Sequence, residues 1–134
     1  MTATVHPTAI VEQGATLGDG VVVGPYAIVG ADVELEDGVV VGAHSVIHGA
    51  THVGARTRLH PHVVLGGAPQ ISGKVEHGTL RVGADNTFRE FTTVNLGSSE
   101  GRGTTTIGDG CLFMANSHVA HDCVLGDHVV FTNS

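Results

Sequence analysis

The sequence has 134 residues, which is the size of one domain, and a formal net charge of −7 at pH 7 from 6 basic and 13 acidic residues. This charge argues against a nucleic-acid binder, which needs a basic surface to displace counterions, and against docking on an anionic membrane. No apolar run approaches the roughly 20 residues of a membrane span, and the N-terminus lacks the basic and apolar regions of a signal peptide. We therefore expect a cytoplasmic protein without a membrane span.

The composition is that of a β-rich protein with few aromatic residues. Glycine contributes 20 residues, tyrosine 1 and tryptophan none, while the hydrophobic fraction is 41%, so the apolar residues are mainly Val, Ile, Leu and Ala. The spacing of Cys111 and Cys123 is not that of a paired-thiol metal site or a disulfide framework. We expect both thiols to fill the core, since free cysteine is often buried.

A repeat of six residues runs through the first half of the sequence. The residue directly after each aliphatic member of the repeat is often glycine, and the fourth residue after it is mostly small or β-branched. An amphipathic helix would need apolar residues three and four apart, a pattern that is absent here. The aliphatic series consists of Val5, Val11, Leu17, Val23, Val29, Leu35, Val41, Ile47, Val53, Leu59 and Leu65.

This period predicts an all-β fold, namely a parallel β-helix. One large and one small inward residue in every six suit a short strand followed by a turn, and three such units make one triangular coil. Neighbouring coils would pair strand on strand in parallel, which satisfies the backbone hydrogen-bonding groups. We expect a single domain over residues 1–134 with about six to seven coils.

Two segments interrupt the repeat. The phase is lost after Leu65, returns at Val82, is lost again after Val94 and returns at Ile107. The intervening segments, 66–80 and 97–106, are rich in Gly, Ser and Thr, as loops are. We expect both segments to leave the β-helix, and loops of this kind often carry functional groups.

Ten histidines occur in the sequence, and their spacing selects among them. His44 and His62 are one coil apart, so we expect them to stack on one face. A stacked pair can bind a metal ion, but position 80, one further coil along, is leucine and supplies no third ligand. We therefore expect no metal at this pair.

The segment 117–123 contains the strongest candidate for catalysis. Val119 is its inward aliphatic residue, so His118 and His121 lie near the turns and can reach outward, and Asp122 follows directly. A carboxylate beside an imidazole fixes its tautomer and raises its basicity, as a general base near neutral pH requires. The same residues could instead decorate a solvent-facing turn, so the spacing leaves both interpretations open.

Three stretches point to a known family: VHPTAIVEQGATLGDGVVVGPYAIVG, VGADNTFREFTTVN and LFMANSHVAHDCVLGDHVVFTNS. Together they resemble the UDP-N-acetylglucosamine O-acyltransferases of lipid A biosynthesis, and the resemblance covers essentially the whole chain. Members of that family move an acyl chain from acyl carrier protein to a sugar hydroxyl of the nucleotide sugar. The resemblance also implies that the β-helix is left-handed, although parallel crossovers are ordinarily right-handed.

The resemblance implies roles for five residues. By position, His121 matches the catalytic base, Asp122 the carboxylate beside it, His118 a substrate-contacting histidine and Gln70 a residue of the loop that borders the sugar site; Lys74 lies near a lysine of that loop. The implied mechanism is direct attack of the sugar hydroxyl on the acyl thioester, with backbone donors stabilising the oxyanion. No metal or redox cofactor is needed, and the family's site lies between the subunits of a homotrimer.

Four positions depart from the family's pattern near the site. Ile71 and Gly73 stand where the family has a sugar-binding aspartate and a lysine, so that Lys74 is displaced by one residue. Asn95 and Leu96 stand where the family has His and Arg. Removing a polar group that binds a sugar hydroxyl commonly costs a few kcal/mol. We therefore expect an altered acceptor or weak turnover.

Two other functions are compatible with the repeat. The first is a non-catalytic trimeric scaffold, for which the repeat alone suffices. The second is a carbonic anhydrase of the same fold, in which three histidines would converge on zinc across a subunit interface. The sequence ends inside a repeat without the C-terminal helical domain of the family, so we also expect trimers to stack through Val129 and Phe131.

Overall fold

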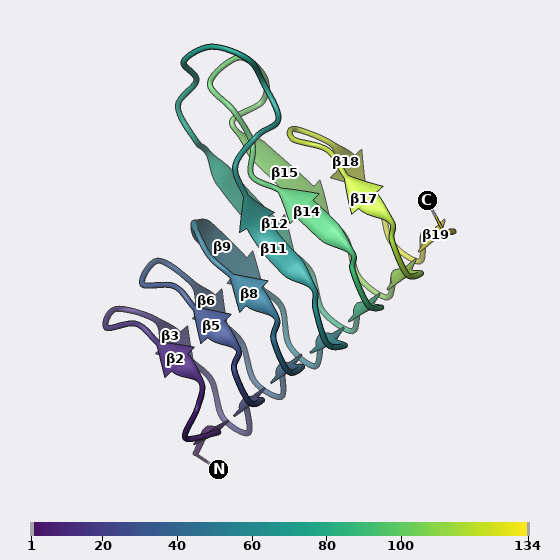
Figure 1. The fold of residues 1–134 in the computed structure, drawn as a ribbon. Coiled ribbons are helices and arrows are strands. Elements are labelled where there is room, and N and C mark those ends of the chain that lie inside the picture. Colours follow the sequence, from purple (N-terminus) through teal and green to yellow (C-terminus); the bar gives the residue numbers. More distant parts are fainter. Residues whose placement is uncertain (1, 134) are drawn as a thin grey trace.

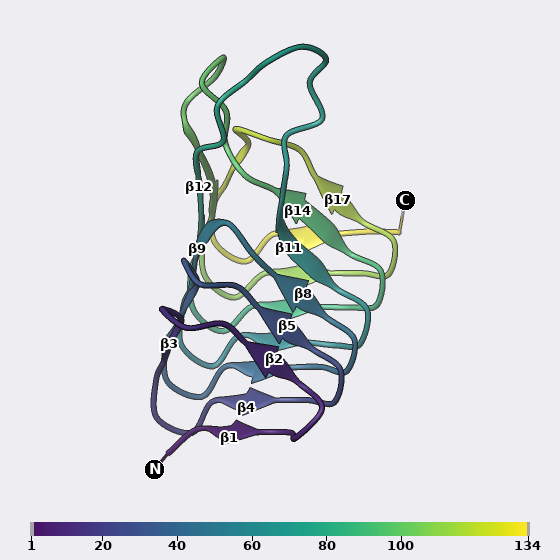
Figure 2. The ribbon, with the colours of Figure 1, turned by 60° about the vertical axis from the view of Figure 1, so that its left-hand side comes forward.

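The computed structural model describes residues 2–133 as a triangular prism of successive coils (Figure 1). This part of the chain contains short strands and no helix, and therefore no helix that could cross a membrane. The strands form three parallel sheets, one along each side of the prism, which we call sheets A, B and C. Figure 2 shows the three sides wrapping around one interior.

The three sheets take their strands in turn from each coil. Sheet A contains β1 (Thr4–Val5), β4 (Val22–Val23), β7 (Val40–Val41), β10 (Arg58–Leu59), β13 (Thr87–Phe88), β16 (Leu112–Phe113) and β19 (Val130–Phe131). Sheet B contains β2 (Ile10–Val11), β5 (Ile28–Val29), β8 (Val46–Ile47), β11 (Val64–Gly67), β14 (Thr93–Asn95) and β17 (His118–Val119). Sheet C contains β3 (Thr16–Leu17), β6 (Glu34–Leu35), β9 (Ala50–Val53), β12 (Thr79–Val82), β15 (Thr104–Ile107) and β18 (Val124–Leu125).

The aliphatic series forms the interior of the prism, as the period predicts. Val23 pairs with Val41, and Val41 pairs with Leu59, so each inward residue stacks on the residue one coil away. Each of these three side chains is only 1% exposed. Val5 is 40% exposed because a coil packs on only one side of it. The predicted parallel β-helix is confirmed.

The second inward position accommodates small and polar side chains. Ala27 and Ser45 are fully buried, and the Ser45 hydroxyl donates to the His60 carbonyl at 2.9 Å while accepting the Val63 N–H at 3.1 Å. A buried hydroxyl with both partners costs little. Cys111 occupies the same position at 2% exposure, and the partly buried Cys123 packs against the core, as expected for both thiols.

The two insertions leave the prism between sheets B and C, but they are shorter than the sequence suggests. They span residues 68–78 and 96–103, whereas we expected 66–80 and 97–106. β12 and β15 pair along four residues, which keeps Leu80 and Thr105 inside the prism at 0% exposure. Threonine is common in loops, but its β-branched side chain also suits a strand, and pairing with the neighbouring coil favours the strand here.

Gly66 allows the chain to turn out of the coil into the first loop. Its φ is +86°, β11 has an irregular register at this point, and a Cβ here would lie 1.9 Å from the His48 carbonyl oxygen. Only glycine fits such a position. Figures 1 and 2 both show the two loops side by side above the prism.

The three outer sides of the prism differ in polarity. The corner between sheets C and A carries acidic residues, whereas the corner between sheets A and B, which we call the A/B corner, carries rings. Sheets A and B turn mainly aliphatic residues outward, with the exposed Arg58 among them on sheet A. The aliphatic residues are Val22, Val40, Leu112 and Val130 on sheet A and Ile10, Ile28, Val46 and Val64 on sheet B. Sheet C and its corner with sheet A carry Glu34, His52, Arg81, Asp19, Asp37, Asp85, Asp109 and Asp127.

Candidate active site

His121 and Asp122 lie in the turn between β17 and β18, next to the second loop. Asp122 has a positive φ of +66°, and its side chain reaches the preceding coil, where it bonds to Ser98. The Nδ1 atom of His121 lies 2.8 Å from the Oδ2 atom of Asp122. The structure therefore brings together the two residues that the sequence singles out.

Asp122 is held by the second loop as well as by His121. Its oxygens accept hydrogen bonds from the Ser98 hydroxyl at 2.7 Å, the Ser98 N–H at 2.9 Å and the Gly103 N–H at 3.1 Å. Its own N–H donates to the hydroxyl of Thr105 at 2.9 Å. One carboxylate thus fixes both ends of the loop 96–103 against the turn.

These contacts keep Asp122 ionised. Burial acts to raise the pKa of Asp122, but the hydrogen bonds from the Ser98 hydroxyl and N–H, from His121 and from the Gly103 N–H outweigh burial and hold the pKa well below its ordinary value. An ionised carboxylate can only accept hydrogen bonds. It therefore requires the proton of a neutral His121 to be on Nδ1, which leaves the Nε2 lone pair free to accept a proton. The His121 side chain is 31% exposed, so a substrate can reach it.

His118 lies nearby on the outer side of sheet B. It pairs in register with Thr93, and its Nδ1 atom lies 2.7 Å from the Thr93 hydroxyl. The imidazole is exposed and separate from the contact between His121 and Asp122. His118 is therefore accessible from solvent on this side of the prism.

Gln70 and Lys74 are exposed on the first loop. Within residues 2–133 neither side chain forms a hydrogen bond or ion pair with His118, His121 or Asp122. Their loop is nevertheless attached to the site, because it is bonded to the second loop. The bonds join Glu76 N–H to the Ser99 hydroxyl at 3.0 Å, Ser99 N–H to the Glu76 carbonyl at 3.0 Å and Gly78 N–H to the Gly97 carbonyl at 2.7 Å.

Ser98 and Thr105 are site residues that the sequence did not reveal. Both are fully buried and both bond to Asp122, although they lie 24 and 17 residues before it in the chain. In the sequence they belong to a Gly-, Ser- and Thr-rich insertion in which no single hydroxyl stands out. Asn95 and Leu96, which depart from the family's pattern, are also buried where the second loop begins.

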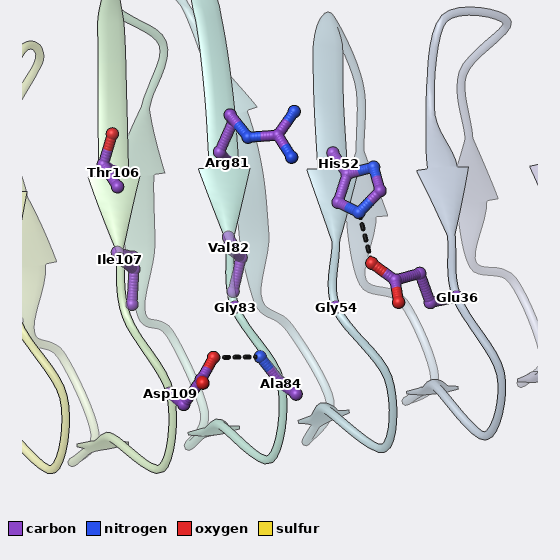
Figure 3. Close-up of a pocket in the computed structure, with 10 residues that line it drawn as sticks. All are labelled: Glu36, His52, Gly54, Arg81, Val82, Gly83, Ala84, Thr106, Ile107 and Asp109. Carbon is purple, nitrogen blue, oxygen red and sulfur yellow. Dashed lines mark hydrogen bonds and ion pairs between the residues drawn. The ribbon is translucent and has the colours of Figure 1, made fainter.

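A groove on the outer side of sheet C lies apart from these residues (Figure 3). Its floor is the backbone of Gly54 and Gly83, where a Cβ on Gly54 would come within 2.4 Å of Gly83. Along its side His52 lies 2.6 Å from Glu34 and also contacts Glu36. The close approach of the coils accounts for the groove, and the ion pairs of His52 with Glu34 and Glu36 tie neighbouring coils together. We therefore assign no site to the groove.

The geometry does not form a metal centre within one chain. In residues 2–133 no group of three or more His, Cys, Asp and Glu residues is placed to hold a metal ion. His118 and His121 direct their Nδ1 atoms to Thr93 and Asp122. A carboxylate-oriented imidazole of this kind is suited to proton transfer.

The fold and the site define a class: a parallel β-helix of six-residue repeats with a carboxylate-oriented histidine beside two loops. The family described as bacterial transferase hexapeptide, with six repeats, matches residues 14–49 and 104–133. The chain belongs to this hexapeptide-repeat family, and its β-helix is left-handed.

Curated relatives agree with this assignment. The chain is 59% identical over 131 residues to the acyl-[acyl-carrier-protein]–UDP-N-acetylglucosamine O-acyltransferase of Anaeromyxobacter sp. (strain K), covering 97% of this chain and 51% of the relative. It is 47% identical over 136 residues to the protein of that name from Rhizobium johnstonii, covering 98% and 49%. The chain thus spans about half the length of the curated relatives it matches.

Solved structures show the same similarity. A UDP-N-acetylglucosamine acyltransferase matches with a TM-score of 0.92 and 40% identity, over 95% of this chain and 49% of that chain. The UDP-N-acetylglucosamine acyltransferase from Campylobacter jejuni matches with a TM-score of 0.87 and 39% identity, over 95% and 50%. The resemblance to these acyltransferases inferred from the sequence is confirmed.

Proposed function

We propose that this chain carries the general base of an O-acyltransferase, which moves an acyl chain from acyl carrier protein to a hydroxyl of a nucleotide sugar similar to UDP-N-acetylglucosamine. One observation supports this most: a half-buried, ionised Asp122 orients an accessible His121. The names of the relatives supply the donor and acceptor classes. The proposal requires no metal or redox cofactor.

The reaction proceeds by direct attack. The Nε2 atom of His121 takes the proton of the sugar hydroxyl while the hydroxyl oxygen bonds to the thioester carbonyl carbon. The carbon–sulfur bond then breaks, and the thiol of the carrier leaves with the proton held by His121. Asp122 stabilises the imidazolium between these two steps, as the carboxylate does in other carboxylate–histidine pairs.

Gln70, Lys74 and His118 are the proposed substrate contacts. The hydrogen bonds between the two loops connect the segment of Gln70 and Lys74 to Asp122, so the loops move with the base rather than independently of it. The apolar Ile71 on the same loop cannot accept a hydrogen bond from a sugar hydroxyl, so the acceptor differs from one that needs a carboxylate there.

We further propose that three copies assemble around the A/B corner. Ile10 on sheet B and Val22 on sheet A are 56% and 40% exposed in one chain, which is unfavourable in water. Copies that each carry a net charge of −7 repel one another most through the corner between sheets C and A, where the aspartates lie. A threefold arrangement, with sheet A of one copy on sheet B of the next, covers both apolar sides of the prism and closes on itself.

This assembly also completes the candidate site. His118 lies on the outer side of sheet B. It is in register with Thr93, which is in register with Val64, so His118 and Val64 lie two coils apart on the same face. Sheet A of a neighbouring copy would therefore form the second wall beside His118 and His121. With two free thiols and substrates of this class, we place the protein in the cytoplasm.

The test is acyl transfer from acyl carrier protein to UDP-N-acetylglucosamine, using the wild-type protein and His121→Ala. We expect a loss of about 10²- to 10⁴-fold in the variant, with the oligomeric mass unchanged because His121 lies on a turn. His6→Ala, in the first coil, is the matched control and should retain activity. A trimer that shows no transfer with any nucleotide sugar would instead support the non-catalytic scaffold.

A further inference from the structure

A column of four stacked rings runs along the A/B corner and takes no part in the proposed reaction. The ring centroids of Tyr26 and His44 are 5.2 Å apart, those of His44 and His62 5.0 Å, and those of His62 and Phe91 5.3 Å. The planes of successive rings differ by 14°, 3° and 11°. The two histidines are therefore stacked, as their spacing predicts, between two aromatic residues.

The backbone places these rings in register. All four residues occupy the same turn position in successive coils, with φ between +59° and +65°. The next residue of the column after His62 is Phe91, not Leu80, because the first loop lengthens that coil. Val64 accordingly pairs with Thr93, 29 residues further on, whereas Val46 pairs with Val64 after 18. All four rings are exposed in the single chain.

One chain cannot hold a metal ion with this pair. Nearly parallel rings that are 5.0 Å apart present their nitrogens along parallel lines rather than toward one point. A zinc ion needs nitrogen ligands at about 2.0–2.1 Å, usually three or four of them. Within residues 2–133 no third ligand joins the pair.

We propose that the trimer binds zinc, or a similar divalent transition metal, on its threefold axis through His44 and His62. This inference rests on the proposed assembly around the A/B corner. At one level of the axis three His44 side chains, one from each copy, point inward, and at the next level three His62 side chains do the same. Each level supplies three imidazole nitrogens around one point, with Tyr26 and Phe91 closing the two ends of the column.

The net charge of the protein and the residues beside the rings do not oppose a cation at this position. Three chains with a charge of −7 each carry −21 together. The turn residues beside the rings are Pro25, Ala43, Pro61 and Glu90, and Arg89 is paired with Glu90 at 2.9 Å. The spacing of 5.0 Å between the histidine levels exceeds twice the zinc–nitrogen distance of about 2.1 Å, so one ion cannot be shared between the levels and each level can bind an ion of its own. We expect one to two zinc ions for every three chains.

Zinc content and molecular mass, measured on the same sample, test the inference. The protein is equilibrated with zinc chloride and dialysed, and its metal is determined by mass spectrometry while light scattering gives its mass. A trimeric wild type should retain about 0.3 to 0.7 zinc per chain. The double variant His44→Gln, His62→Gln should remain trimeric and retain less than a tenth of that amount. The control His48→Gln, His128→Gln changes two exposed histidines at the other two corners of the prism and should match the wild type.

The outcomes separate the inference from its premise. A trimeric wild type without bound zinc, or a double variant that retains as much zinc as the wild type, would overturn the metal site and leave the assembly intact. A wild type that is not trimeric would overturn the assembly, and the metal site with it, whatever the result for acyl transfer. In crystals soaked with zinc, anomalous diffraction should place the ion on the threefold axis at the level of His44 or His62.

Discussion

The side chain of Asp122 has two structural roles. It accepts a hydrogen bond from Nδ1 of His121, and through Ser98 and Gly103 it fixes the second loop against the turn. The hydrogen bonds that anchor the loop are the same ones that keep the carboxylate ionised. Orientation of the base and attachment of the loop therefore depend on one side chain.

Replacing Asp122 by asparagine should abolish the proposed acyl transfer. The amide would present an N–H group to Nδ1, which favours the tautomer with the proton on Nε2 and removes the lone pair that takes the substrate proton. We expect acyl transfer to fall by about 10²- to 10⁴-fold. The control Asp32→Asn, at an exposed position, should retain activity, and full activity of Asp122→Asn would show that the carboxylate does not orient the base.

The same carboxylate should make stability depend on pH. Because the pKa of Asp122 is lowered in the folded state, the unfolded chain takes up this proton first as the pH falls, and the stabilisation is present above the ordinary aspartate pKa of about 3.9. Urea unfolding of the wild type and Asp122→Asn should therefore differ most near pH 7. The difference should shrink between about pH 5 and pH 3. A difference that is constant over this range would contradict the assigned ionisation.

The two loops are joined by hydrogen bonds and form one structural unit. The first is bonded to the second through Glu76, Ser99 and the pair Gly78 and Gly97, and the second is bonded to the β17–β18 turn through Asp122. These segments lie far apart in the sequence and side by side in Figure 1. Weakening the bonds between the second loop and Asp122 should therefore loosen both loops.

Ser98→Ala tests this connection. The change removes the hydroxyl donor at 2.7 Å but leaves the Ser98 N–H, so the fold should persist with a loss of about 1–2 kcal/mol. We expect faster hydrogen exchange at the amides of Ser99 and Gly103, together with a lower rate of acyl transfer. Ser72→Ala, on the exposed part of the first loop, provides the comparison. Unchanged exchange in Ser98→Ala would show that the loops are held independently of Asp122.

The prism as a whole has two sets of apolar side chains, one inward and one outward. The inward side chains build the fold within one chain, and the outward side chains of sheets A and B are left for contacts between copies. Val41 and Val22 represent the two kinds, since Val41 is 1% exposed and Val22 is 40% exposed on the same sheet. An equivalent substitution at each position should therefore have different effects.

Val41→Asp should prevent folding, because an unpaired carboxylate cannot be accommodated in an apolar interior. Val22→Asp should fold, since its side chain points away from the core, but it should fail to assemble because the charge enters the proposed interface. Circular dichroism reports the strand content of each variant, and light scattering reports its mass. A folded Val41→Asp would contradict the prism, and a trimeric Val22→Asp would contradict the assembly.

The period of six was enough to predict the architecture. It places Val23, Val41 and Leu59 in the interior, because a repeated short strand and turn can bury one large and one small side chain in every six residues only by closing into a coil. The sequence also located the pair His121 and Asp122, since adjacent residues remain adjacent in any fold. It placed the loop boundaries less well, because Leu80 and Thr105 join strands through pairing with neighbouring coils.

Contacts between residues far apart in the sequence could not be derived in this way. The number of residues that loop out of each coil sets which side chains meet across coils, and this number is not fixed by the period. Phe91 rather than Leu80 therefore stacks on His62, and Ser98 and Thr105 reach Asp122 from the preceding coil. The repeat specifies the prism because its interactions are periodic, whereas the site arises where the loops break that period.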